Sequence, residues 1–295
     1  MGNKTLDKHS PSKRDIYTVD SFAHGISFGK QTVSMGEDDP RDALSLRIPD
    51  DNSVIKLRSR YVLHKHNPLH QLELGLIKLS RKGKLSSAVI YLGTLSDPFF
   101  PFEGKFDASM KFLELFQRYT PGLLKVQTRS PLIVLAMPVL KKLGKHAAVT
   151  IGIETSDEYM AHRYTPGLPK ISERLQAARA LKRFGVEVTA QVSPLLPYGD
   201  WRKDTLDFAH KLDDVSNYIH LQGIVEDQTT REAKIRSSRI ARRLATDRKF
   251  HWLRPDASEP LRKELQSLCP DKLELPKRAH LEKRQLGLFA EADAA

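Results

Sequence analysis

Side chains able to bind a ligand gather just after the predicted β-strands of this chain. Four consecutive strand candidates, at residues 88–92, 123–127, 148–153 and 186–192, are each followed by hydroxyl, carboxylate, amide or guanidinium groups. Because parallel strands end at the same edge of a sheet, we expect these groups to converge on one site. The candidate ligand-binding residues are Gly93, Thr94, Ser96, Asp97, Glu103, Thr128, Arg129, Ser130, Glu154, Thr155, Ser156, Gln191 and Pro194.

The same residue types are also preferred at the N-terminal caps of helices, and each of these strand ends leads into a helical pattern. For Thr94, Asp97, Ser130 and Asp157 the sequence leaves capping and ligand contact open. The number of polar groups at successive strand ends favours a ligand site for the set as a whole.

The elements that position these groups alternate between short apolar runs and helical patterns. Helical stretches are predicted at 108–119, 132–143, 171–184 and 204–212, and a fifth strand at 218–224. This order predicts an α/β fold with a parallel sheet, open or closed into a barrel. Residues 1–55 are predicted to form a mostly irregular arm, 56–269 the compact part, and 270–295 a loose tail.

Composition excludes several classes of protein. The chain has 295 residues, a net charge of +12, a pI near 9.6 and a mean hydropathy of -0.44. No apolar run is long enough for a membrane span, and Met1 to Pro11 lacks the apolar core of a secretory signal, so we expect a cytoplasmic protein without a membrane partner. The single Cys269 excludes an internal disulfide or a zinc ribbon. Composition leaves the oligomeric state open.

Half of the net charge falls in one segment. Residues 231–249 hold eight Lys and Arg against two acidic residues, a balance of +6. Ile235, Ile240 and Leu244 predict one amphipathic helix with a cationic outer face. Such a face suits phosphate groups, although a run of charge is more often only solvated, and no base-reading motif accompanies it. The candidate nucleic-acid contacts are Arg231, Lys234, Arg239, Arg242 and Arg243.

Five segments, taken in order, resemble the radical S-adenosylmethionine superfamily and, within it, the spore photoproduct lyase-like branch. They are residues 91–103, 126–130, 151–156, 174–181 followed by Gly185, and 192–197. The resemblance implies a partial (β/α)6 TIM-type barrel that binds S-adenosylmethionine at the carboxyl ends of its strands.

The resemblance also implies roles for individual residues. Residues 93–97 would approach the methionine amino group of the ligand, and Arg129 would bind its carboxylate. Thr155 and Ser156 would line the next strand end, and Gln191 with Pro194 would lie near the adenosine.

The loop that carries the CxxxCxxC cluster motif in this family matches residues 67–79, but the three cysteine positions hold Leu72, Leu76 and Leu79. Leucine has no ligand atom, so a [4Fe–4S] cluster is not expected. The i, i+4, i+7 spacing predicts instead a helix that packs against the barrel mouth. Without a cluster there is no electron for radical chemistry, and we predict a non-catalytic or divergent protein that binds S-adenosylmethionine or a nucleoside.

The sequence leaves two kinds of catalytic site possible. His66, His70 and Glu73 have the same three-then-two spacing and would suit a different metal held by two histidines and one carboxylate. Glu103 and Glu154 could act as acid and base without a radical. The sequence therefore does not decide whether the protein is an enzyme.

Overall fold

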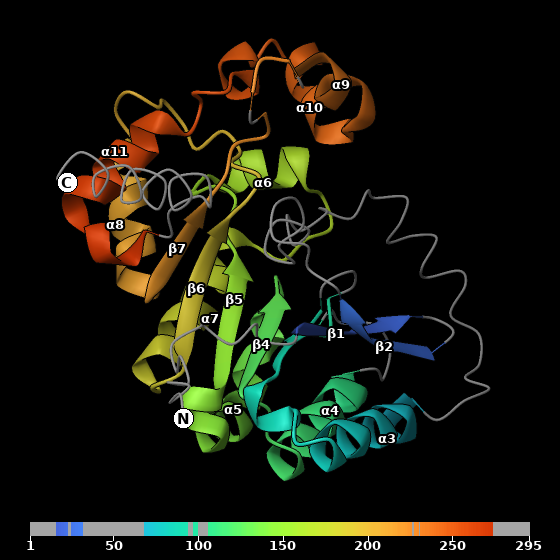
Figure 1. Cartoon of the computed structure of the whole chain (residues 1–295). Helices are drawn as coiled ribbons and strands as arrows, with labels where there is room; N and C mark the ends of the chain where they lie inside the picture. The colour runs from blue at the N-terminus through green and yellow to red at the C-terminus, as the bar shows by residue number, and fades with distance from the viewer. Residues whose placement is uncertain are drawn as a thin grey trace, which may run out of the picture.

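The centre of the structure, a computed structural model, is a sheet of seven described strands in the order β2-β1-β3-β4-β5-β6-β7 (Figure 1). The strands β1 and β2 pair antiparallel, and every other neighbouring pair is parallel. The strands are β1 (Ile16–Phe22), β2 (Gly25–Gln31), β3 (Val89–Leu92), β4 (Leu123–Thr128), β5 (Ala147–Gly152), β6 (Glu187–Val192) and β7 (Tyr218–Leu221). The structure describes residues 16–22, 25–31, 68–93, 97–99, 106–225, 227–229 and 231–273.

Helices connect and flank the strands, which confirms the predicted α/β fold. The helices α3 and α4 pack together, as do α8 and α11, while α6, α9 and α10 lie beyond the carboxyl ends of β5 to β7 (Figure 1). The α-helices are α3 (Pro68–Arg81), α4 (Phe106–Arg118), α5 (Met137–Leu143), α6 (Glu158–Tyr164), α7 (Ile171–Arg183), α8 (Thr205–Val215), α9 (Arg231–Ser237), α10 (Arg239–Thr246) and α11 (Glu259–Leu268). Short 3-10 turns are η1 (Leu85–Ser87), η2 (Pro131–Ala136), η3 (Gly144–His146), η4 (Phe250–Leu253) and η5 (Pro270–Lys272).

Strands β3 to β6 are buried along most of their length, and in β4 and β6 the residues of the hydrophobic core alternate with more polar ones. All four residues of β3 are buried, and only Glu187 of β6 is exposed. Gly185, at φ +86°, ends α7 in the left-handed conformation that favours glycine, and its N–H bonds the carbonyl of Lys182. Helix α7 therefore turns directly into β6.

The leucine segment forms the predicted helix, α3. Leu72 and Leu76 are fully buried in the core, and Leu79 nearly so. The expected packing against the barrel mouth is wrong: α3 contacts α4, β2 and η1, and η1 directly precedes β3. Because only residues 82–88 join α3 to β3, the end of the helix is held near the start of that strand, away from the carboxyl edge.

The two ends of the compact part also differ from the expectation. The arm expected to be mostly irregular contains β1 and β2, which pair with each other and join the sheet beside β3. The expected tail begins with η5 and with Leu273, which forms a parallel bridge to Ile219 of β7. Residues 32–67 and 274–295 lie outside the described part.

Among the described residues, no helix is long and apolar enough to cross a membrane.

Candidate functional site

The ends of β3, β4, β5 and β6 bring polar side chains together, because these four strands are neighbours in the sheet. Direct side-chain contacts join adjacent ends, among them Asp97 with Thr128 and Arg129 with Glu154. Most of the predicted residues in this region are almost inaccessible to solvent. The buried polar residues are Gln127, Thr128, Arg129, Ser130, Glu154, Thr155, Gln191 and Ser193.

Asp97 fastens the loop after β3 to the end of β4. Its carboxylate accepts hydrogen bonds from the Thr128 hydroxyl at 2.6 Å, from the Arg129 N–H at 2.7 Å and from the Phe99 N–H at 2.9 Å. Burial raises the pKa of Asp97 above its usual value, and these bonds and the Arg129 charge offset only part of that effect. Asp97 therefore orders the backbone around Arg129.

A buried charge cluster, formed by Arg129, Glu154 and Arg174, occupies the centre of the site. The Nε of Arg129 bonds one oxygen of Glu154, and the Nη1 of Arg174 bonds the other at 2.6 Å. Nη1 of Arg174 also bonds the carbonyl of Gly152 at 2.7 Å. Burial alone would raise the pKa of Glu154, but the two guanidinium charges outweigh it and lower the pKa to about 2. The cluster holds two positive charges and one negative charge.

This excess of positive charge comes with unused hydrogen-bond donors. Nη2 of Arg129, and Nε and Nη2 of Arg174, are buried and have no hydrogen-bond partner among the described residues. A buried donor without an acceptor costs about 1–3 kcal/mol, and more when it is charged. The geometry therefore suits an additional acceptor, such as the carboxylate of a ligand.

Two glycines allow the chain to pack closely around the cluster. A Cβ on Gly152 would lie 2.9 Å from Cγ of Arg129 and 3.0 Å from Oε1 of Glu154, so any side chain there would displace the ion pair. Gly93, at φ +94°, would place a Cβ 2.5 Å from Cδ of Pro98 and 2.7 Å from the carbonyl oxygen of Gln127. The protein's own chain thus fills the space beside Gly93.

Other predicted ligand residues make contacts within the chain. Ser130 caps η2 by accepting the Leu132 N–H, and Asp157 caps α6, as the alternative interpretation allowed. The Thr155 hydroxyl donates to the carbonyl of Pro197 at 2.6 Å. Ser156 and Pro194 are partly exposed, whereas Thr94, Ser96 and Glu103 lie outside the described residues. A ligand role for these residues stays a prediction.

The residues present do not fit an iron–sulfur cluster. The three motif positions are buried leucines within α3, and Cys269 lies at the C-terminal cap of α11. For the alternative metal site, Glu73 is already engaged by Nη1 of Arg118 at 3.1 Å. His66 lies outside the described part of the chain, within which no group of three potential metal ligands occurs.

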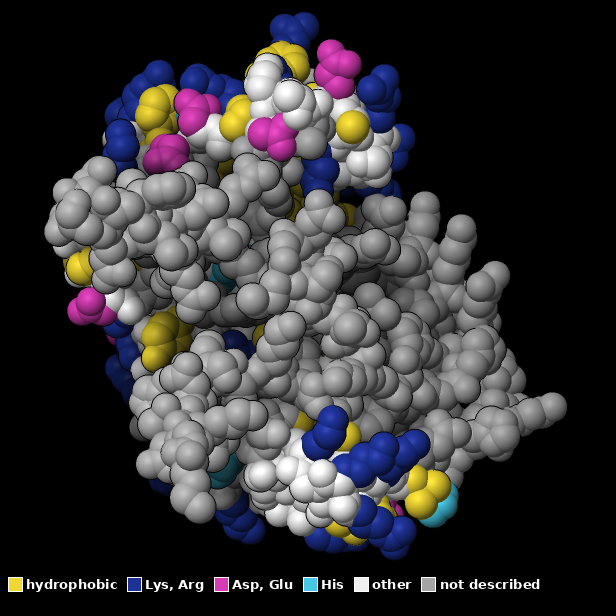
Figure 2. All heavy atoms as spheres, in the orientation of Figure 1, with side chains coloured by type: hydrophobic (Ala, Val, Ile, Leu, Met, Phe, Trp, Pro, Cys, Tyr) yellow, Lys and Arg dark blue, Asp and Glu magenta, His cyan; other side chains and the backbone are white. Residues whose placement is uncertain are grey.

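The basic segment is not the single helix predicted. It forms α9 and α10, which are separated at Ser238, whose hydroxyl accepts the Ala241 N–H at 3.2 Å and so starts a second helix. Lys234, Arg236 and Arg242 are exposed, whereas Arg231, Arg239 and Arg243 are partly buried. Basic side chains are prominent at the upper edge of the molecule, where α9 and α10 lie (Figure 2).

Asp247, one of the two acidic residues of this segment, is turned toward α6. It accepts two hydrogen bonds from the Arg163 guanidinium and one from the Tyr164 hydroxyl at 3.0 Å. The Arg163 bonds lower the pKa of Asp247 to about 2. Its charge is therefore neutralised by Arg163 and does little to offset the basic residues of α9 and α10.

Arg174 is a site residue that the sequence analysis did not identify. It lies on the buried face of α7 with Ile171, Ala177, Ala178 and Leu181. A charged residue within an otherwise apolar helix face requires a buried partner. This pattern in the sequence of α7 could have identified Arg174 as a buried, paired residue.

No family model matches the chain. Over 125 residues it is 29% identical to the uncharacterized protein ORF301 of Acidianus two-tailed virus, a stretch that covers 42% of this chain and 38% of that protein. The chain thus spans about two fifths of that curated relative.

Similar solved structures include several of spore photoproduct lyase, and the three described next are each 13% identical to this chain. A cysteine-to-serine mutant has a TM-score of 0.49, with 71% of this chain and 67% of that chain covered. The complex with dinucleoside spore photoproduct also has a TM-score of 0.49, with 74% and 69% covered. A double mutant with bound AdoMet and dinucleoside spore photoproduct has a TM-score of 0.47, with the same coverage.

Proposed function

We propose that this chain is a radical S-adenosylmethionine-like protein, related to the spore photoproduct lyase-like branch, that binds S-adenosylmethionine or a related nucleoside without radical chemistry. The observation that carries the proposal is the buried charge cluster at the strand ends. Arg129 is fixed there by Glu154, and its Nη2 has no partner among the described residues.

Arg129 is well suited to hold the carboxylate of such a ligand. Its guanidinium cannot lose its charge, and the Glu154 bond and the Asp97 bond to its backbone fix its position before a ligand arrives. A preorganised donor loses less entropy on binding. Arg174 is a positioning residue in this scheme, because it shares the Glu154 carboxylate and compensates for its charge.

The proposal assigns no radical step to the protein. In related enzymes the cluster supplies the electron that cleaves S-adenosylmethionine, and the leucines of α3 cannot ligate iron. Anaerobic reconstitution with iron and sulfide should therefore leave the protein without stoichiometric metal. A stable spectrum with four irons per chain would overturn this part of the proposal.

The ligand site is tested by calorimetric titration of S-adenosylmethionine into metal-free Arg129→Gln and Arg129→Lys proteins. Both should bind at least tenfold more weakly than the unmodified protein, because glutamine has no charge and lysine lacks the fork of donors. The matched control is Arg183→Gln, an exposed arginine of α7, which should bind normally. Unchanged affinity in folded Arg129→Gln protein would overturn the assignment.

A second candidate function, nucleic-acid binding by α9 and α10, is favoured by the orientation of Asp247. Arg163 pairs with that carboxylate, and Glu232 of α9 lies 3.9 Å from Arg236, so neither acidic residue of the segment pairs with the exposed Lys234 or Arg242. Phosphate contacts of this kind make binding fall steeply with salt.

The salt dependence of duplex DNA binding tests this candidate. In Lys234→Ala/Arg242→Ala protein, the slope of log K against log salt should decrease by about 2, at roughly 0.9 per lost contact. The double control Lys78→Ala/Arg183→Ala removes two exposed charges from α3 and α7 and should keep the slope. A slope near zero in the unmodified protein would contradict nucleic-acid binding through phosphate contacts. A decrease in slope in the control protein as large as that in Lys234→Ala/Arg242→Ala would contradict the assignment to α9 and α10.

A further inference from the structure

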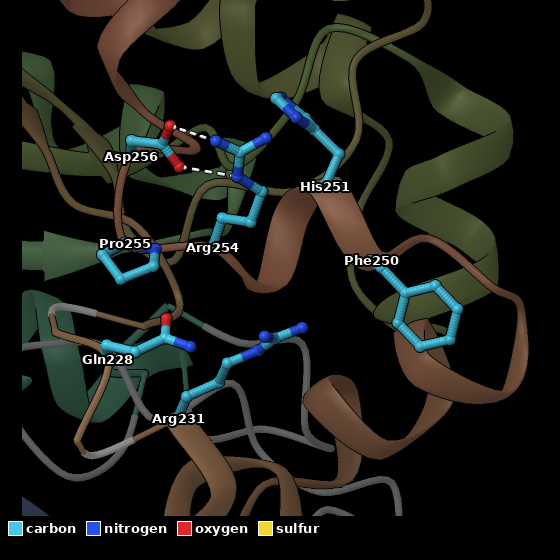
Figure 3. A pocket seen from close by; sticks show the side chains of 7 residues that line it. All are labelled: Gln228, Arg231, Phe250, His251, Arg254, Pro255 and Asp256. Carbon is cyan, nitrogen blue, oxygen red and sulfur yellow. Dashed lines mark hydrogen bonds and ion pairs between the residues drawn. The ribbon is translucent and has the colours of Figure 1, made fainter.

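A hollow of about 670 Å³ lies apart from the strand-end site, between the start of α9 and the turn η4 (Figure 3). It is open to solvent and combines cationic, amide and aromatic side chains. Its lining residues are Gln228, Arg231, Phe250, His251, Arg254, Pro255 and Asp256.

The two arginines of this hollow are in different electrostatic states. Arg254 is paired through two hydrogen bonds of 2.9 and 2.6 Å with Asp256, so its charge is compensated. Arg231 makes no ion pair with any described carboxylate, and its Nε is buried without a hydrogen-bond partner there. Within the described part of the chain, Arg231 therefore supplies a positive charge with no paired carboxylate and a donor that can still accept a partner.

Aromatic surface lies on the same hollow. Phe250 is 51% exposed, so its ring is accessible to a ligand, and the Arg231 side chain extends toward it (Figure 3). His251 is stacked on Trp201, with ring centroids 4.5 Å apart and planes 8° from parallel, and Arg202 lies 4.3 Å from the Trp201 ring. This stack holds His251 in place at the wall.

His251 adds a second unsatisfied group, because its Nε2 is buried without a partner among the described residues. Burial, followed by the charge of Arg254, lowers the pKa of His251 below its usual value, which favours the neutral ring. A neutral imidazole can donate or accept one hydrogen bond at Nε2. The Gln228 amide likewise offers both a donor and an acceptor.

We propose that this hollow binds a nucleoside phosphate, with the phosphate on Arg231 and the base against Phe250. A guanidinium pairs well with phosphate, an exposed aromatic ring stacks on any base, and the amide of Gln228 can bond a base edge. A free nucleotide and the 5′-phosphorylated end of an oligonucleotide share this chemistry. The proposal does not rest on S-adenosylmethionine binding at the strand ends.

The test is calorimetric titration of the full chain with AMP, adenosine and inorganic phosphate. AMP should bind saturably, and adenosine and phosphate should each bind at least tenfold more weakly. Arg231→Gln and Phe250→Ala should each weaken AMP binding at least tenfold, whereas Arg236→Gln, an exposed cation of the same helix, should change it less than twofold. Arg231→Lys, which keeps the charge, should retain part of the affinity.

Equal affinities for AMP and adenosine, or a loss of AMP affinity in Arg236→Gln equal to that in Arg231→Gln, would overturn the proposal. A 5′-phosphorylated hexanucleotide distinguishes the two sources of this chemistry. If it binds more tightly than AMP, the ligand is the 5′ end of an oligonucleotide. If it binds more weakly, the ligand is a free nucleotide. S-Adenosylmethionine affinity should be unaffected in Arg231→Gln, so failure of this proposal and failure of the strand-end proposal give different results.

Discussion

Arg129, Glu154 and Arg174 show what single residues contribute and how far they can be predicted. The sequence placed Arg129 and Glu154 at neighbouring strand ends, which the structure confirms. The sequence did not predict that Arg129 and Glu154 bind each other. The positions of the strand ends determine which side chains lie close together, but not the rotamers that those side chains adopt. Arg174 comes from a helix that follows β5, and only the apolar stripe around it pointed to burial.

Replacing Glu154 by glutamine should destabilise the fold strongly. The substitution leaves two buried guanidinium groups without a counter-charge, and breaking a buried pair in this way costs about 3–5 kcal/mol. The matched control is Asp214→Asn, which breaks the exposed Asp214–Arg179 pair and should cost less than about 1 kcal/mol. Free energies of unfolding from urea denaturation measure both. Equal small losses would show that the cluster is solvated.

The pH dependence of stability gives an independent check on Glu154. Its folded pKa, about 2, lies below its ordinary value of 4.5, so ionised Glu154 stabilises the fold above pH 4.5. That contribution should disappear as the pH falls from about 4.5 toward 2. Asp97 affects stability in the opposite direction. Because its pKa is raised in the folded protein, its contribution to the free energy of unfolding falls as the pH rises. The difference in unfolding free energy between unmodified and Glu154→Gln protein, measured across this range, isolates Glu154; a flat difference would contradict the cluster.

At the scale of elements, the spacing of apolar residues predicts that a segment is helical, but it does not predict where the helix packs or where it ends. The leucine spacing predicted α3, yet the helix packs beside α4 because a short connection ties it to β3. The basic segment has helical spacing throughout, but Ser238 divides it into two helices, and serine is a common N-cap. A single serine within a polar stretch, such as Ser238, is not enough to predict that a helix ends there.

Leu76→Ala should cost about 2–5 kcal/mol of unfolding free energy, because it opens a cavity in the core where Leu76 is fully buried. Leu74→Ala, on the exposed side of the same helix, is the matched control and should change stability by less than about 0.5 kcal/mol. Chemical denaturation of the two proteins measures the difference. Similar costs at both positions would mean that α3 presents a different face to the core.

At the scale of the whole molecule, the alternation of strands and helices predicted the parallel sheet, and the structure confirms it from β3 to β7. The edge hairpin of β1 and β2 was not predicted, because these segments show no sustained alternation of apolar and polar residues, although β1 contains residue types that favour strands. One hydrophobic core runs from Leu72 of α3 to Leu273 beside β7. The described part should therefore unfold as one unit.

Two spectroscopic probes test this cooperativity. Both tryptophans, Trp201 and Trp252, lie beyond the carboxyl ends of the strands, whereas Leu76 is in α3. In Leu76→Ala protein, tryptophan fluorescence and far-UV circular dichroism should shift together to one lower midpoint. A fluorescence transition that stays at the original midpoint would show that the two regions unfold separately.

The central claim is that the strand-end site binds S-adenosylmethionine although the chain has no cluster ligands. The most direct measurement is a calorimetric titration of S-adenosylmethionine into the unmodified, iron-free protein. We expect saturable binding at one site per chain, with a Kd in the micromolar range. Absence of binding up to millimolar ligand in folded, iron-free protein would contradict it.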